Sequence, residues 1–361
     1  SRRCPQAVVL PVRHGLYSRV SAQVMAVLAE VTPVLEKVSI DEAFLDVTGA
    51  RRRMGSPVTI GRWIRAEIRR RVGVPASVGI ASTKFIAKLA SSHAKPDGLL
   101  LVPAASTQDF LNVLPVGALW GVGTRTQEVL ARWGIQDVRT LAGTDVRRLE
   151  KILGRAAGHH LHELSHGVDP RRVEPVREEK SVGTETTFFE TLTDWEHARR
   201  ILLDQTHQCA ARLRAADLRC RVAVLKARGA DFTTVTRSRT LATPTDLAQD
   251  IWETVSSLYS ALPTPPGGFR LLGVRVEGLL RPDDGVQLLL DEDPRRGASE
   301  RAADAVRRRW GANALAPASL LPEDGTTKAP LGQQGRRGRG PHRSEQESRP
   351  ASRPTSTESF S

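Results

Sequence analysis

The sequence predicts an α+β protein. In residues 17–102 and again in 181–281, apolar residues at helical spacing alternate along the chain with apolar residues at strand spacing. Residues 105–173, which lie between these stretches, carry helical spacing interrupted by glycine turns. We therefore expect two mixed layers of helices and strands, separated by a small all-helical part.

The first mixed region begins with a helix over 17–31, which stops before Pro33. Segment 38–49 follows as a strand, a turn and a strand, because the phase of its alternating apolar residues slips by one at Asp41 and Glu42. Such a slip predicts a tight turn or bulge, where adjacent carboxylates need not point to opposite faces. The remaining elements expected here are a basic helix 58–71, a strand 76–81, a helix 83–92 and a strand 99–102.

The rest of the chain divides by composition. Residues 174–182 are polar and charged and contain Pro175, as is typical of a linker. From 322 to 361, 16 of 40 residues are Gly, Pro or Ser, so we predict a disordered tail. In the second mixed region we expect one strand that starts at 181 and three more at 219–227, 232–241 and 269–279. We expect helices there at about 193–216 and 246–262.

The positive charge is concentrated near the start of the chain. The 361 residues carry a formal net charge of +13. Residues 1–104 hold 16 Lys and Arg against 7 Asp and Glu, a local excess of +9. A focused positive field favours polyanionic partners such as DNA, RNA or nucleoside triphosphates. The alternative is codon bias, since Arg outnumbers Lys by 45 to 8.

Composition also excludes some classes of protein. No stretch approaches the roughly 18 consecutive apolar residues of a membrane span, and no signal peptide is recognised, so we expect no membrane partner. The three cysteines, Cys4, Cys209 and Cys220, form neither a CxxC motif nor an even disulfide set. We therefore expect a cytoplasmic protein. We also expect the protein to be a monomer.

Asp41 and Glu42 are the first candidates for chemistry. Paired carboxylates at the end of a strand are hard oxygen ligands suited to Mg²⁺. Lys84 and Lys88 lie four residues apart on one predicted helix face, and Lys95 follows in a loop, so ammonium groups would lie near a bound triphosphate. The ordinary alternatives are a pair of exposed turn acids and a solvated helix face.

Two long motifs carry a resemblance to a known family. VSIDEAFLDVTG (38–49) and SVGIASTKFIAKLASSHAKPDG (77–98) resemble signature strings of the Y-family translesion DNA polymerases, closest to the DNA polymerase IV type. This resemblance implies a template-directed DNA polymerase that adds dNTPs to a primer 3′ end on damaged DNA. It also implies a palm domain (1–104, with a ferredoxin-like αβ layer), a thumb domain (105–173) and a little-finger domain (183–282), with the linker (174–182) between thumb and little finger. A C-terminal extension (283–321) and the tail (322–361) follow.

The resemblance implies a role for individual residues. Two Mg²⁺ ions would act, with Asp41 a ligand of both and Glu42 a ligand of the catalytic ion, while Lys95 would contact the triphosphate. The family's first palm strand, of the type D-x-D-x-F-F-A, supplies a third carboxylate, and nothing in residues 1–16 matches it. We therefore expect this chain to lack the first palm strand and most of the fingers, with its own activity in doubt. A non-catalytic scaffold that binds DNA and a sliding clamp is the alternative, and a nucleotidyl cyclase is a remoter one.

Gly121 and Gly123 mark a candidate contact with DNA. They form a G-x-G turn, and Thr124 is expected to be the N-cap of the helix that follows. Glycines allow the backbone to approach a phosphate and the helix amides to donate to it, as in a helix-hairpin-helix motif. The alternative is an ordinary turn between helices.

The second mixed region carries a further candidate DNA surface. Basic and apolar residues alternate along its strands, which predicts one buried face and one basic face. Arg221, Arg237 and Arg239 are our main candidates for contact with primer–template DNA. The full set is Arg219, Arg221, Lys226, Arg228, Arg237, Arg239, Arg270 and Arg275.

Two further motifs lead to opposite conclusions. GVQLLLDEDPR (285–295) resembles the short Gln-Leu-x-Leu peptide that binds the sliding clamp, with Gln287, Leu288 and Leu290 as anchors, although it could also be a buried strand. His159, His162 and His166 share a predicted helix face, but no Cys or acid completes a zinc set. We therefore predict no metal site at these histidines.

Overall fold

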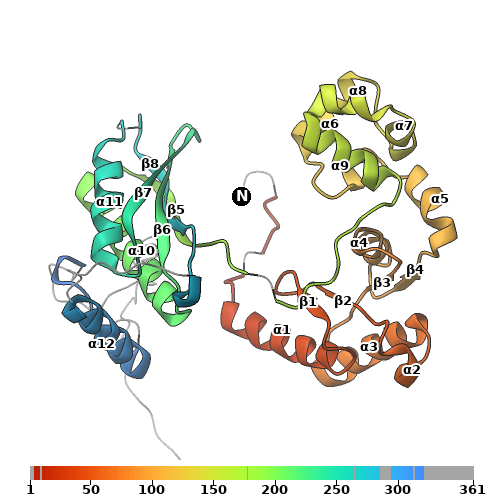
Figure 1. Cartoon of the computed structure of the whole chain (residues 1–361), viewed down its shortest axis with the longest axis horizontal. Coiled ribbons are helices and arrows are strands. Elements are labelled where there is room, and N and C mark those ends of the chain that lie inside the picture. Colours follow the sequence, from red (N-terminus) through yellow and green to blue (C-terminus); the bar gives the residue numbers. More distant parts are fainter. Residues whose placement is uncertain are drawn as a thin grey trace, which may run out of the picture. The chain divides into compact units, whose positions relative to one another are not determined.

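The structure is a computed structural model, and it describes residues 4–8, 10–176, 178–263, 265–284, 294–311 and 314–320. Helices and strands both occur, as the α+β prediction requires. The chain forms two compact units, Ser1–Arg177 and Glu178–Ser361, and each is described by itself (Figure 1). Both the clamp-like peptide at 287–290 and the tail at 322–361 lie outside the described residues.

The first part of unit 1 consists of helices and very short strands. Strands β1 and β2 pair antiparallel, and β3 and β4 pair parallel. Ser56 caps α3 by accepting a hydrogen bond from the Thr59 amide at 3.1 Å, and the helix ends at Gly73, whose φ is 77°. The elements are α1 (His14–Ala29), β1 (Leu35–Lys37), β2 (Ala43–Leu45), α2 (Arg51–Met54), α3 (Pro57–Val72), β3 (Val78–Ile80), α4 (Lys84–His93) and β4 (Leu99–Leu101).

One predicted strand of this part is wrong. The alternation of Val38 and Ile40 predicts a strand there, but β1 ends at Lys37 and both side chains are exposed, at 39% and 46%. The amides of Val38 and Ser39 both donate to the Glu42 carbonyl, at 3.0 and 3.2 Å. Closing this turn removes residues 38–42 from the strand ladder, so apolar alternation at a turn does not imply pairing.

The second part of unit 1 is helical. Its core includes Leu111, Leu130 and Leu149 and is continuous with Phe85 and Ile86 of α4, so the helical part and α4 share one apolar cluster. Asp137 and Asp145 cap α7 and α8 through their carboxylates. The elements are η1 (Ala104–Ser106), α5 (Thr107–Asn112), η2 (Val116–Ala118), α6 (Thr124–Arg132), α7 (Val138–Ala142), α8 (Val146–Leu153) and α9 (Arg155–Ser165).

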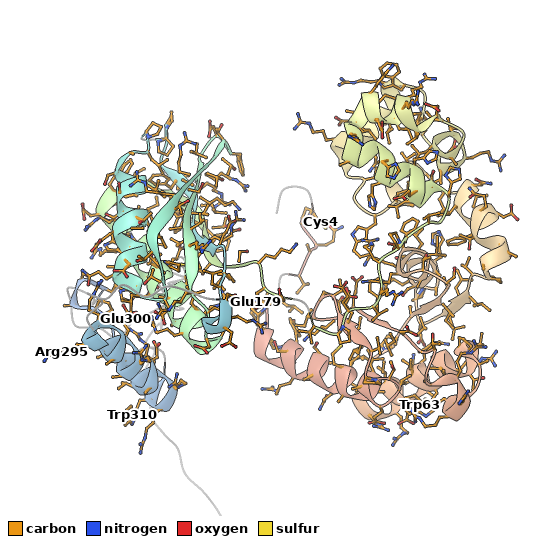
Figure 2. All side chains as sticks on the ribbon, in the orientation of Figure 1. Cys4, Trp63, Glu179, Arg295, Glu300 and Trp310 are labelled. Atoms are coloured by element: carbon orange, nitrogen blue, oxygen red, sulfur yellow. The ribbon has the colours of Figure 1, made fainter. Side chains whose placement is uncertain are left out.

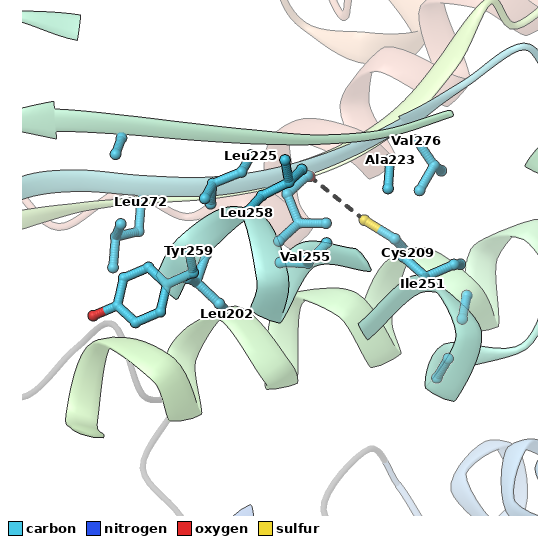
Figure 3. Close-up of a cluster of buried hydrophobic side chains, with 14 of the residues drawn as sticks. Leu202, Cys209, Ala223, Leu225, Ile251, Val255, Leu258, Tyr259, Leu272 and Val276 are labelled. Carbon is cyan, nitrogen blue, oxygen red and sulfur yellow. Dashed lines mark hydrogen bonds between the residues drawn. The ribbon is translucent and has the colours of Figure 1, made fainter. Parts of the chain in front are cut away.

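Unit 2 is built on one antiparallel sheet with the strand order β5-β8-β6-β7. Helices α10 and α11 pack against one face of the sheet and bury Leu202, Leu225, Ile251 and Leu272 (Figure 3). The elements are β5 (Ser181–Leu192), α10 (Trp195–Ala215), β6 (Cys220–Gly229), β7 (Thr234–Thr245), α11 (Ala248–Ser260), β8 (Phe269–Glu277), η3 (Pro282–Asp284), α12 (Pro294–Trp310) and η4 (Ala318–Leu320).

Two cysteines belong to the unit 2 core. The Cys209 thiol donates to the Val274 carbonyl at 3.6 Å, and the Cys220 thiol donates to the Thr245 carbonyl at 3.4 Å. Burial raises the pKa of Cys209 to about 11 and that of Cys220 to about 12. Both thiols are therefore protonated at neutral pH and serve as small apolar groups.

Helix α12 is attached to the rest of unit 2 by a buried cation. The Arg214 side chain is only 5% exposed and pairs with Glu300 and Asp304 of α12. Glu300, labelled in Figure 2, also accepts hydrogen bonds from the Ala248 amide at 2.9 and 3.1 Å. The same two acids thus bring α12 into contact with both α10 and the start of α11. None of the described helices is long and apolar enough to cross a membrane.

Candidate functional site

The carboxylate pair lies in the turn between β1 and β2. Ser39 holds Asp41 from one side: its hydroxyl donates to Asp41 Oδ1 at 2.6 Å and accepts from the Asp41 amide at 3.3 Å. Asp41 is exposed, and Glu42 is 44% exposed at its side chain. The turn therefore presents two adjacent carboxylates to solvent, and the serine orients one of them.

The two lysines of α4 have different partners. Lys88 Nζ lies 2.7 Å from Glu42 Oε2, with its side chain 34% exposed. Lys84 pairs with Glu36 in a nearly buried contact, with side chains 10% and 17% exposed. Lys84 also donates to the Arg172 carbonyl at 3.1 Å, so its ammonium is used within the fold. Only Lys88 of this pair reaches the carboxylate turn.

Lys95 lies in the loop that follows α4, and its side chain is exposed. The next residues are held by α3: Arg65 donates to the Asp97 carbonyl and to its carboxylate, and Arg69 pairs with the same carboxylate. Desolvation raises the pKa of Asp97, but the two guanidinium groups outweigh it and lower that pKa overall. Within the described residues, the Lys95 ammonium has no hydrogen bond or ion pair and is available to a ligand.

The G-x-G turn has the geometry expected of an anion site, with one correction. Gly121 has a φ of 91°, and Gly123, not Thr124, is the N-cap of α6. The Gly123 carbonyl accepts from the Gln127 amide at 3.0 Å, which starts the helix one residue earlier than expected. No side chain caps α6, so its first amides are free of side-chain partners. Gly121, Gly123 and Thr124 are all exposed.

Trp120, which directly precedes this turn, connects it to the carboxylates. Its ring stacks on Phe44 of β2 with centroids 6.2 Å apart. Lys88 Nζ and the Arg171 guanidinium lie 5.6 and 4.5 Å from the Trp120 centroid. The sequence analysis missed these contacts, although a tryptophan immediately before G-x-G in a chain with only 4% aromatic residues was a usable signal.

Asp169 fixes this cluster from within the protein. Its side chain is 1% exposed, binds Arg171 at 2.7 and 2.9 Å, and accepts from the Phe85 amide at 3.1 Å. Desolvation raises the pKa of Asp169, whereas the bonds to Arg171 and Phe85 lower it by more. The carboxylate therefore holds Arg171 against Trp120 and ties it to the start of α4.

The strands of unit 2 do not form a single basic face, so that expectation is wrong. Arg237 lies opposite Leu225 and Arg239 opposite Ala223, which puts both arginines on the helix-covered side of the edge strand. Arg239 donates to Ser257 of α11 at 3.0 Å. The register of β7, which alternation within one strand does not reveal, decides the face.

The opposite face of the sheet carries some of the other basic residues. Lys226, Arg228 and Arg275 occupy it by register, and Arg221 lies exposed at the bulge near the start of β6. Acids neutralise part of this charge: Lys226 pairs with Glu185 at 2.8 Å, and Arg275 with Glu277 at 2.6 Å. The candidate DNA residues of unit 2 therefore lie on two different faces.

Comparison with known proteins identifies the family. The impB/mucB/samB family matches residues 1–92, and the C-terminal domain of that family matches 179–290. A DNA polymerase IV of Desulfatibacillum aliphaticivorans is 37% identical over 322 residues, which cover 88% of this chain and 81% of the relative. A DNA polymerase IV of Alkalilimnicola ehrlichii is 40% identical over 296 residues, covering 80% and 82%.

Solved structures give the same fold. A chimera of the Y-family DNA polymerases Dbh and Dpo4 superposes with a TM-score of 0.68 at 24% identity, covering 78% of this chain and 81% of the chimera. An insertion ternary complex of Dbh DNA polymerase superposes with a TM-score of 0.54 at 23% identity, covering 78% and 81%. These likenesses define the class as a Y-family polymerase fold. With its sequence relatives, the chain belongs to the DNA polymerase IV type of the Y family, the translesion DNA-directed DNA polymerases.

Proposed function

We propose that this chain extends primer 3′ ends on damaged DNA by two-metal nucleotidyl transfer from dNTPs. The observation that carries the proposal is the exposed turn in which Ser39 orients Asp41 and Lys88 neutralises Glu42. Unit 1 would supply a palm (1–104) and a thumb (105–173), and unit 2 a little finger (183–282) after the linker (174–182). Family membership supports this division.

The carboxylate turn fits a magnesium site in part. Among the described residues, no group of three or more His, Cys, Asp or Glu side chains is placed to hold a metal ion. Mg²⁺, however, is commonly held by one or two carboxylates together with waters and substrate phosphates. Asp41 and Glu42 supply that number, with Asp41 proposed as the shared ligand. When bound, the two ions would activate the primer hydroxyl and stabilise the charge of the transferring phosphoryl group.

The other residues would bind and orient the substrates. Lys95, exposed beside a loop that Arg65 and Arg69 hold in place, would bind the triphosphate. The first amides of α6 and the glycines at 121 and 123 would donate to a phosphate of the primer–template duplex. Arg221, Arg237 and Arg239 would add contacts to the DNA backbone, the last two through the β7 edge.

Substitution at Asp41 tests the proposal. Nucleotide insertion is measured for the 361-residue chain and for the same chain preceded by a D-x-D-x-F-F-A strand. We expect Asp41→Ala to lower the rate of nucleotide insertion by three or more decades in whichever parent is active. A ligand shared by both ions contributes several kcal/mol of transition-state stabilisation, and about 1.4 kcal/mol corresponds to one decade of rate. Primer–template affinity should stay within a few-fold.

Asp109→Ala is the matched control, since it removes an exposed carboxylate from α5. Melting temperatures of all variants exclude unfolding as the cause. An Asp41→Ala protein that inserts nucleotides within a few-fold of its parent would remove the carboxylate pair as the metal site. If neither parent inserts nucleotides but both bind DNA, the non-catalytic scaffold is the better function.

A sliding clamp is a further proposed partner, through Gln287, Leu288 and Leu290. These residues lie outside the described part of the chain, so the proposal rests on the sequence motif alone. Loss of clamp binding in a Gln287→Ala/Leu288→Ala protein that keeps full DNA affinity would support it.

A further inference from the structure

Lys88 has two partners of different kinds. Its ammonium lies 2.7 Å from Glu42 Oε2 and 5.6 Å from the centroid of the Trp120 ring. One partner is a carboxylate that our proposed function assigns to a metal ion. The other is an aromatic face, which attracts a cation without neutralising it.

The Trp120 ring is held in place independently of Lys88. Phe44 stacks against it, and Arg171 lies 4.5 Å from its centroid. The buried Asp169 carboxylate binds Arg171 and also the Phe85 amide, at the start of the helix that carries Lys88. The aromatic surface beside Lys88 is therefore present whether or not Lys88 is bound to Glu42.

Lys84, one turn earlier on α4, provides an internal contrast. Its ion pair with Glu36 is 10% and 17% exposed, whereas that of Lys88 with Glu42 is 34% and 44% exposed. A shielded pair is difficult to break because both charges would be left unpaired away from water. The exposed pair is weak and open to competing ions. Of the two lysines, only Lys88 is placed to exchange its partner.

We propose that Lys88 is an exchangeable counter-ion of Glu42. Lys88 pairs with the Glu42 carboxylate when no divalent ion is bound. When such an ion binds Glu42, the Lys88 ammonium is displaced from the carboxylate and remains against the Trp120 ring. The ion pair holds the Glu42 side chain in place when no metal ion is bound. Because a metal ion must displace Lys88, the affinity of the turn for that ion is lower. This inference rests on the proposed function, since it assumes that the turn binds a divalent cation.

Direct titration with Mn²⁺, followed by electron paramagnetic resonance, tests the exchange without requiring activity. We expect Lys88→Met to tighten Mn²⁺ binding by about two- to fivefold, the effect of removing an exposed ion-pair competitor. Lys88→Arg keeps the competing charge and should bind like the parent. Lys151→Met, which removes an equal charge from α8, measures and corrects for the general electrostatic effect.

A double-mutant cycle tests whether the Trp120 ring holds the displaced Lys88 ammonium. Trp120→Leu should weaken Mn²⁺ binding about two- to fivefold in the parent, since the ring, already 5.6 Å from the ammonium in the Glu42 pair, is the partner that remains to Lys88 once the ion holds Glu42. In the Lys88→Met background, Trp120→Leu should have no effect. An equal effect in both backgrounds would show that Trp120 acts only on the fold and would overturn its role.

The remaining outcomes separate this inference from the proposed function. If Lys88→Met binds Mn²⁺ as weakly as the parent or more weakly, Lys88 does not compete for Glu42 and the inference is wrong. If Asp41→Ala leaves Mn²⁺ binding unchanged, the turn is not the metal site and both proposals fall. If Asp41→Ala removes binding while Lys88→Met has no effect, only the inference fails.

Discussion

The two units of the chain obtain their stability in different ways. Each described strand of the first unit has three residues, and most of its candidate functional groups lie in turns and loops between helices. The second unit has strands of 9 to 12 residues in one sheet, with a core of aliphatic and aromatic side chains and two thiols. Two-stranded sheets are marginal by themselves, so the helices of unit 1 must hold its turns in place. Most of the candidate functional groups thus lie where the backbone is least regular.

The largest effect should come from Arg214 in unit 2. Arg214→Met leaves Glu300 and Asp304 without their buried partner, which typically costs about 3–5 kcal/mol. We expect faster hydrogen exchange across α12 and a lower melting temperature. Arg308→Met, an exposed position on α12, should change neither. An Arg214→Met protein as stable as its parent would show that α12 contributes little to unit 2.

A glycine in unit 1 should give the next largest effect. A Cβ at Gly158 would lie 2.5 Å from the Glu150 backbone nitrogen, so α8 and α9 must separate to admit it. Gly158→Ala should cost about 1–3 kcal/mol, as overpacking usually does. Gly143→Ala is the matched control, since its Cβ would meet nothing closer than 3.5 Å. Thermal unfolding of the two variants makes the comparison.

The two buried thiols should give unit 2 a dependence on high pH. Their pKa values of about 11 and 12 exceed the unfolded value of roughly 8.5, so the folded state favours the protonated thiols. This contribution is complete below about pH 8.5 and is lost as the pH rises toward the folded values. Unfolding of the parent and of Cys209→Ala/Cys220→Ala should show a steeper loss above pH 8.5 in the parent. Parallel pH profiles would contradict the assignment.

The smallest effects should distinguish the two faces of the unit 2 sheet. Binding to primer–template DNA should fall steeply with salt, and each lost phosphate contact should lower the log–log slope by about 0.9. We compare Arg237→Gln/Arg239→Gln with Arg228→Gln/Arg275→Gln, two double variants of equal charge on opposite faces. The pair that lowers the slope identifies the DNA-binding face. If neither changes the slope, this sheet does not contact the phosphates.

The sequence was sufficient for several helices and strands of the two mixed regions, but not for α2 and α12 or for the three-dimensional relations of the elements. Helical spacing predicted α3, α4, α10 and α11 to within a few residues, because this signal is local. The position of Arg239 depends on how β7 pairs with β6, and that of Val38 on a turn closed by Glu42. Both are non-local relations, which apolar alternation does not encode.

The candidate site shows the same limit. Adjacent acids and a charged α4 were visible in the sequence, and the long motifs indicated the family. The different partners of Lys84 and Lys88 were not visible, since both occupy the same helix face. Nor could the sequence indicate that Asp169, 84 residues after Phe85, accepts a hydrogen bond from that residue's amide.

The bond from Glu300 to the Ala248 amide has a consequence for the biosynthesis of the protein. Leu247, the N-cap of α11, offers no side-chain acceptor, and the acid that satisfies the first amide of this helix comes 52 residues later. A growing chain emerges from the ribosome in sequence order. The first turn of α11 must therefore wait, incompletely bonded, until α12 has been synthesised. Unit 2 thus reaches its final hydrogen bonding only after residue 300 has left the ribosome.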